Sequence, residues 1–137
     1  MEKKNIDWSS IGFAYMPTDY RYVSNFKDGK WDEGTLSTDP NIVLNECAGV
    51  LQYSQSVFEG LKAYTTEDGH IVTFRPDLNA ERMAASAARL EMPVFPKERF
   101  IDAVEQVVKA NAAWVPPYGS GATLYLRPYM FGSNAVI

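Results

Sequence analysis

The sequence predicts an α+β fold that contains an antiparallel or mixed sheet and two consecutive helices. A hairpin signal at residues 67–69 joins two short β-strands. Apolar side chains recur at helical spacing after Pro96, and apolar and polar side chains alternate through residues 122–130. Antiparallel strands together with helices that follow one another along the chain are typical of this fold class.

The composition is that of a globular protein with room for one domain. The chain has 137 residues, of which 46% are hydrophobic and 22% are charged. Aromatic residues make up 13%, which suits either a thick core or a pocket that holds flat, apolar ligands. The net charge is -4 and the basic residues are scattered, so nucleic acids and anionic membranes are poor candidates for partners.

Cysteine and histidine are too few for a disulfide or a metal centre. Cys47 is the only cysteine, which excludes an internal disulfide, and we expect it to be a small buried hydrophobe. His70 has no second histidine near it, so no metal site is predicted. The N-terminus lacks the apolar run of a signal peptide, and no stretch approaches the ~20 apolar residues of a membrane span. The expected location is the cytoplasm.

The first half of the chain predicts extended segments and turns. Residues 11–23 are rich in Tyr and Phe and indicate extended chain, and residues 27–30, with sequence KDGK, predict a turn. Residues 32–45 are mixed and interrupted by proline, which indicates a loop. Residues 60–65 and 71–74 predict the two strands of the hairpin.

Two helices are predicted next. The first begins at Pro76, with Asp77 or Asn79 as its cap, and ends near Leu90. The second follows Pro96 and ends by residues 115–117. Its apolar stripe consists of Phe100, Ile101, Val104, Val107 and Val108, with Asn111 at its end.

The predicted strand at residues 122–130 carries a candidate anion site. Side chains alternate across a strand, so Leu124 and Leu126 share one face, which we expect to be the core face. Tyr125 and Arg127 share the other face. An arginine binds a carboxylate through two N–H groups and a neighbouring phenol adds a hydroxyl, although a solvated sheet face has the same pattern.

The first helix carries a second candidate. Arg82, Ser86 and Arg89 recur on one face, and Arg82 falls in the first turn if Asn79 is the cap. A cation there opposes the helix dipole unless an anion lies nearby, and a phosphate group reverses the sign of that interaction. An ordinary exposed arginine is the alternative interpretation.

These candidates coincide with blocks that resemble branched-chain amino-acid aminotransferases, which are fold type IV enzymes dependent on pyridoxal 5'-phosphate (PLP). The resemblance extends over roughly residues 11–132, with its blocks in the family's order and spacing. These blocks are LQYSQSVFEGLKAY at 51–64, FRPDLNAERM at 74–83, SAARL at 86–90, WVP at 114–116 and LYLRP at 124–128. The resemblance implies transamination between L-leucine, L-isoleucine or L-valine and 2-oxoglutarate.

The resemblance also implies roles for individual residues. Arg82 matches the arginine that binds the PLP phosphate, and Tyr125 and Arg127 match the pair that binds a substrate carboxylate. Phe13, Phe58 and Tyr125 match walls of the pocket for the branched side chain. Tyr53 matches a residue that reaches the active site of a neighbouring subunit, so a homodimer is implied.

One essential group of the family has no match. The Schiff-base lysine lies in the family's C-terminal domain, and none of the seven lysines here occupies its position. We therefore expect residues 1–137 to form an incomplete N-terminal small domain on the substrate side, which is inactive alone. The alternatives are a D-amino-acid aminotransferase, an aminodeoxychorismate lyase of the same fold type, and a non-catalytic dimerisation domain. The sequence does not indicate a preference among the three branched substrates.

Overall fold

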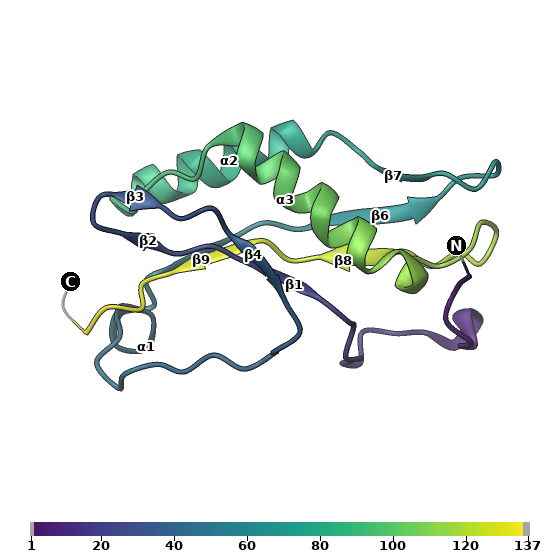
Figure 1. Cartoon of the computed structure of the whole chain (residues 1–137), viewed down its shortest axis with the longest axis horizontal. Helices are drawn as coiled ribbons and strands as arrows, with labels where there is room; N and C mark the ends of the chain where they lie inside the picture. Colours follow the sequence, from purple (N-terminus) through teal and green to yellow (C-terminus); the bar gives the residue numbers. More distant parts are fainter. Residues whose placement is uncertain (1, 136–137) are drawn as a thin grey trace.

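Two helices lie over one face of a set of short antiparallel strands in the computed structural model, which describes residues 2–135 (Figure 1). The elements, in chain order, are the 3-10 helix η1 (Trp8–Ser10), β1 (Arg21–Val23), β2 (Phe26–Lys27), β3 (Lys30–Trp31), β4 (Thr35–Ser37), α1 (Gly49–Tyr53), β5 (Ser56–Phe58), β6 (Leu61–Thr65), β7 (Ile71–Thr73), α2 (Pro76–Arg89), α3 (Lys97–Ala110), the 3-10 helix η2 (Ala112–Trp114), β8 (Leu124–Leu126) and β9 (Tyr129–Phe131). The predicted α+β class is confirmed.

Two extended runs of chain form the centre of the fold: β5 followed by β6, and β8 followed by β9. β5 pairs with β9, and β6 pairs with β8, all antiparallel, while β7 pairs with the other side of β6 in the three-stranded sheet β7-β6-β8. The backbone N–H of Glu59 donates to the carbonyl of Pro128 at 2.8 Å and links the two runs where their strands are interrupted. The predicted hairpin of β6 and β7 is confirmed.

Alternation along these strands separates a core face from an open face. Leu61, Ala63 and Leu126 are buried on the face that the helices cover. The core cluster also takes in Val57, Ala80, Met83, Ala87, Met92, Phe100, Val104, Val108, Val115 and Met130. The predicted direction of the two leucines is confirmed, since Leu126 is buried and Leu124 packs against the core.

The start of α2 differs from the prediction. The helix begins at Pro76 as expected, but its N-cap is Arg75, whose φ of 48° is left-handed, and no side chain caps it. Asp77 and Asn79 both lie inside the helix, so the predicted caps are wrong. Asp77 instead accepts two hydrogen bonds from the Arg75 guanidinium. Its negative charge in the first turn interacts favourably with the helix dipole.

The second helix matches its predicted stripe. Phe100, Val104 and Val108 are buried, and α3 ends at Ala110, followed by the C-cap residue Asn111, which is 2% exposed. Its side-chain oxygen accepts the backbone N–H groups of Asp19 and Tyr20 at 3.0 and 2.9 Å. Its amide nitrogen donates to the carbonyls of Tyr20 and Val107, so the Asn111 amide ties the N-terminal segment to the helix.

Several finer predictions need correction. Residues 122–130 form two strands, because Arg127 and Pro128 interrupt the ladder. Residues 32–45 contain β4, which pairs with β1, and so are not loop throughout. Cys47 is exposed. The turn at residues 27–30 is confirmed, because Asp28 and Gly29 both have positive φ between β2 and β3.

Candidate functional site

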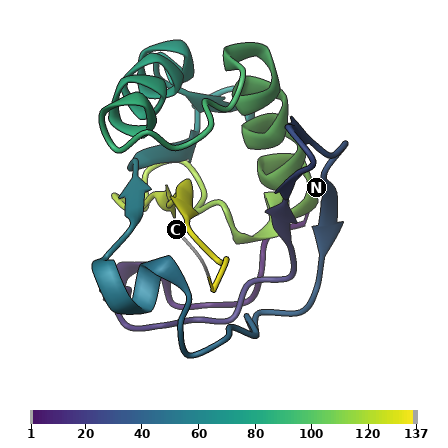
Figure 2. The ribbon, with the colours of Figure 1, turned by 90° about the vertical axis from the view of Figure 1, so that its left-hand side faces the viewer.

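The sheet face turned away from the helices carries three of the candidate substrate residues, Phe58, Tyr125 and Arg127. Figures 1 and 2 both place the N-terminal segment and the connection from β4 to α1 on this side of the sheet. Phe58, Lys62 and Tyr64 are exposed on β5 and β6, at alternate positions to the buried residues. Tyr125 is exposed on β8, with its Cα opposite that of Lys62.

Three predicted residues come together on this open face. The Nε and Nη2 groups of Arg127 donate to the Tyr125 hydroxyl at 3.3 and 3.0 Å. The Arg127 guanidinium also lies over the Phe58 ring, 4.5 Å from its centroid. Among the described residues Arg127 forms no ion pair with a carboxylate. We call Phe58, Tyr125 and Arg127 the open-face cluster; it presents an unneutralised cation beside an aromatic surface.

Gly60 makes room for this cluster. A Cβ atom at position 60 would lie 2.3 Å from the Tyr125 hydroxyl oxygen and 3.0 Å from its ring carbon Cζ. Any side chain here would therefore displace the phenol to which Arg127 donates. The glycine in the Phe-Glu-Gly sequence thus has a steric role within this chain.

Arg82 has a partner that the sequence did not reveal. Its Nε donates to Oε2 of Glu59 at 2.7 Å and its Nη2 donates to Oε1 at 2.5 Å. Asn79 donates from Nδ2 to the same Oε1 at 2.9 Å and to the Gly60 carbonyl at 3.2 Å. Glu59 is 5% exposed, whereas the Arg82 side chain is 67% exposed.

The protonation of this pair follows from its geometry. The Arg82 guanidinium holds the pKa of Glu59 below its usual value, and the hydrogen bond from Asn79 acts in the same direction, while burial opposes both. The Glu59 carboxylate in turn raises the pKa of Arg82. Glu59 is therefore ionised at neutral pH, and its charge is neutralised by Arg82.

The predicted position of Arg82 at the helix start is wrong. α2 begins at Pro76, so Arg82 lies in its second turn, beyond the first-turn range of the helix dipole. The anion that accompanies it in the structure is Glu59. Among the described residues, Nη1 of Arg82 donates no hydrogen bond, so the outer edge of the guanidinium is open to an anion such as a phosphate group.

The remaining predicted site residues stand apart from the cluster. Phe13 is fully exposed in the N-terminal segment, and Tyr53 is 70% exposed at the end of α1. Neither forms a hydrogen bond or ring contact with the open-face cluster among residues 2–135. Glu59 and Asn79 are the residues that sequence reasoning missed.

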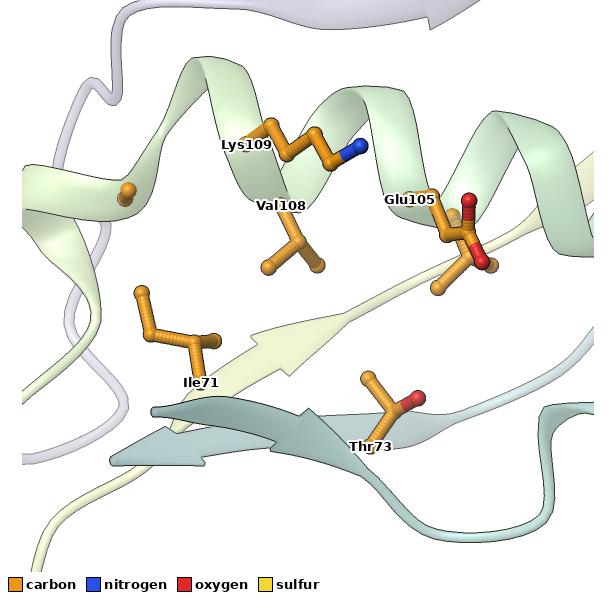
Figure 3. A pocket seen from close by; sticks show the side chains of 7 residues that line it. Ile71, Thr73, Glu105, Val108 and Lys109 are labelled. Atoms are coloured by element: carbon orange, nitrogen blue, oxygen red, sulfur yellow. The ribbon is translucent and has the colours of Figure 1, made fainter. Parts of the chain in front are cut away.

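A hollow elsewhere on the surface contains no predicted site residue. It has a volume of about 410 Å³ and lies between α3 and the edge strand β7. Figure 3 shows Val108 of α3 and Ile71 of β7 pointing into this space.

In the part of the chain that is described, no group of three or more His, Cys, Asp or Glu residues could hold a metal ion. No helix within residues 2–135 is long and apolar enough to cross a membrane.

The sequence is similar to curated aminotransferases along nearly its whole length. It is 55% identical over 129 residues to a branched-chain-amino-acid aminotransferase of Haemophilus influenzae, and 45% identical to that of Helicobacter pylori. Both alignments cover 94% of this chain and 38% of the relative. A methionine aminotransferase of Arabidopsis thaliana is 46% identical, with 97% of this chain and 38% of the relative covered. No protein-family model matches the chain.

Solved structures give the same result for the fold. A branched-chain aminotransferase from Thermoproteus uzoniensis, solved with norvaline, aligns with a TM-score of 0.60 at 26% identity, covering 85% of this chain and 35% of that one. A second branched-chain aminotransferase, complexed with N-(5'-phosphopyridoxyl)-L-glutamate, aligns with a TM-score of 0.59 at 28% identity, covering 72% of this chain and 31% of that one. The predicted resemblance to branched-chain aminotransferases of fold type IV is confirmed.

Proposed function

We infer that this chain, which is homologous to branched-chain aminotransferases over 94% of its length, forms the substrate-side part of a PLP-dependent transaminase. It spans 38% of the length of the first curated relatives, so the activity belongs to a longer protein. That protein transfers an amino group between L-leucine, L-isoleucine or L-valine and 2-oxoglutarate.

The open-face cluster is the observation that carries this proposal. Arg127 offers a cation without a carboxylate partner among the described residues, and Phe58 and Tyr125 supply aromatic surface beside it. One site of this kind accepts both substrate classes. The arginine binds the distal carboxylate of glutamate, and it stays solvated while the aromatic surface contacts the side chain of leucine.

Arg82 is the proposed ligand of the PLP phosphate. PLP supplies the electron sink for transamination when it is bound. The outer edge of the Arg82 guanidinium carries N–H donors that no described residue uses, and these can donate to phosphate oxygens. The chemistry of the donor therefore fits the cofactor.

Two exposed aromatic residues fit a homodimer. We propose that Phe13 completes the wall of the side-chain pocket and that Tyr53 reaches the active site of a neighbouring subunit. Both side chains are largely exposed in the isolated chain. This exposure is expected for side chains that another segment or a second subunit covers in the complete protein. We also propose that the protein is cytoplasmic and acts in branched-chain amino-acid biosynthesis.

The 137-residue chain alone is proposed to be inactive as an incomplete small domain. None of its seven lysines matches the lysine that holds PLP in the family. Turnover of L-leucine with 2-oxoglutarate by the isolated 137-residue polypeptide would contradict this.

The function is tested with the full-length protein that contains this chain. We expect turnover of L-leucine, L-isoleucine and L-valine with 2-oxoglutarate, and little turnover of D-alanine. L-methionine is a useful comparison, because one relative is a methionine aminotransferase. Preference for D-alanine over L-leucine would instead favour a D-amino-acid aminotransferase.

A further inference from the structure

We propose that Glu59 is a positioning residue for cofactor binding, which holds Arg82 by one edge and presents the other edge to the PLP phosphate. The inference rests on the proposed function and extends it to a residue that contacts neither cofactor nor substrate. The observation behind it is the pair of hydrogen bonds from Nε and Nη2 of Arg82 to the two carboxylate oxygens of Glu59.

Glu59 occupies an unusual position for a carboxylate. It lies between Val57 and Leu61 on the core face, and its side chain is 4% exposed. A buried ionised carboxylate is costly unless it is paired and hydrogen-bonded. Three hydrogen bonds meet this requirement, two from Arg82 and one from Asn79.

The pair fixes a side chain that would otherwise be mobile. The Arg82 side chain is 67% exposed, and an exposed arginine samples many rotamers. Two parallel N–H bonds to one buried carboxylate define the plane and direction of the guanidinium. Asn79 fixes the carboxylate in turn through Oε1, so the orientation of Arg82 is set by groups inside the fold. A phosphate then meets donors that are already oriented, which lowers the entropic cost of binding.

The same short segment connects the two candidate sites. Glu59 points to α2 and holds Arg82, whereas the next residue, Gly60, leaves the space that the Tyr125 hydroxyl occupies. Asn79 bonds both to the Glu59 carboxylate and to the Gly60 carbonyl. The segment thereby sets the distance between the phosphate anchor and the substrate cluster.

Glu59→Gln in the full-length protein tests the proposal. Gln keeps the size but has an NH2 donor in place of one carboxylate oxygen, so it cannot accept Nε–H and Nη2–H of Arg82 on two separate oxygens. Glu59→Asp keeps the charge but is one methylene shorter, so it cannot reach Arg82 in the same bidentate geometry. Glu81→Gln is the matched control, because Glu81 lies next to Arg82 on α2 and pairs with Lys97 instead.

The readouts are the dissociation constant of PLP from the apoenzyme and the ³¹P NMR shift of bound PLP. We expect Glu59→Gln to raise the dissociation constant about tenfold and to move the ³¹P resonance. Glu59→Asp should give the same direction of change, and Glu81→Gln should change neither readout. A purely structural role would lower the unfolding temperature without moving the ³¹P resonance.

Unchanged PLP affinity and ³¹P shift in both Glu59 variants would overturn the proposal while leaving the function intact. If Glu59→Gln does not fold, the same two readouts are taken on Glu59→Asp and Asn79→Ala. Each of these variants weakens the hydrogen bonding that orients Arg82 and disturbs the fold less than Glu59→Gln. Failure of the wild-type protein to bind PLP at all would instead remove the proposed function, and this inference with it.

Discussion

The Tyr125 hydroxyl lies within hydrogen-bond distance of both Nε and Nη2 of Arg127, at 3.3 and 3.0 Å. The two side chains therefore form one unit, in which the phenol orients a guanidinium that has no carboxylate partner among the described residues. We propose that this arrangement lets the open face discriminate between an acidic and an apolar substrate.

Arg127→Ala separates those two substrates. We expect the kcat/KM for glutamate to fall about 10- to 100-fold, because charge-assisted hydrogen bonds contribute ~1.5–3 kcal/mol. The kcat/KM for leucine should change only a few-fold, since its side chain has no charge to pair. Steady-state kinetics on both substrates in the full-length enzyme check this. Equal losses on the two substrates would argue against the carboxylate role.

Gly60→Ala should damage the open face by displacement. The new Cβ would lie 2.3 Å from the Tyr125 hydroxyl oxygen, so the phenol must move away from Arg127. We expect the kcat/KM for glutamate to fall about tenfold or more, as for the loss of a charge-assisted hydrogen bond. Gly12→Ala is the matched control, because a Cβ there meets no atom within 4 Å. A Gly60→Ala enzyme with wild-type kinetics would show that the Tyr125 position is unimportant.

Asn111→Ala should destabilise the protein. It removes a buried amide and leaves the backbone N–H groups of Asp19 and Tyr20 without that acceptor. The expected loss is about 1–3 kcal/mol of stability. A lower unfolding temperature of the full-length protein, compared with the exposed Asn41→Ala control, is the measurement. The same unfolding temperature in both variants would contradict the role of Asn111 as a tie.

The Glu59–Arg82 pair predicts a dependence of stability on pH. The pKa of Glu59 is lowered in the folded state, chiefly by Arg82, so its contribution is fully present above the unfolded-state pKa and is lost as pH falls through the folded-state pKa. Wild type should therefore exceed Glu59→Gln in stability by a constant amount at neutral pH. That difference should shrink below about pH 4.5, the ordinary range of a glutamate. Unfolding temperatures measured from about pH 3 to 8 test it, and a difference that does not shrink in acid would contradict the ion pair.

The helices were predictable because their signals are local. Phe100, Val104 and Val108 recur at helical spacing within α3 itself, so no distant residue is needed to recognise the helix. Pro76 marks the start of α2 because its fixed φ suits the first helical position. The cap of α2 was not predictable in the same way. Arg75 takes a left-handed conformation that its residue type does not favour, and no capping side chain marks the position.

Strand β4 shows where local signals end. Thr35–Ser37 is only three residues long, so its single apolar residue is too weak a signal, and it is a strand because it pairs with β1. The break between β8 and β9 was missed for a related reason. Alternation continues through Arg127 and Pro128, although proline has no N–H to continue a ladder.

The candidate site was predictable in part. Tyr125 and Arg127 are two residues apart on a strand, so their proximity follows from the period of the strand. Arg82 and Glu59 are 23 residues apart, and their contact depends on how α2 packs over β5. A signal was nonetheless present, because Glu59 alternates with Val57 and Leu61 and therefore falls on a core face, where a carboxylate needs a cation.

The most direct test of the account is the PLP dissociation constant of Arg82→Ala in the full-length protein, with Arg89→Ala on the same helix as control. We expect Arg82→Ala to weaken PLP binding at least about tenfold while the ratio of leucine to glutamate turnover, measured at saturating PLP, stays near that of wild type. Arg89→Ala should bind PLP as the wild type does. Unchanged PLP affinity in Arg82→Ala would contradict the assignment of the phosphate site to this chain.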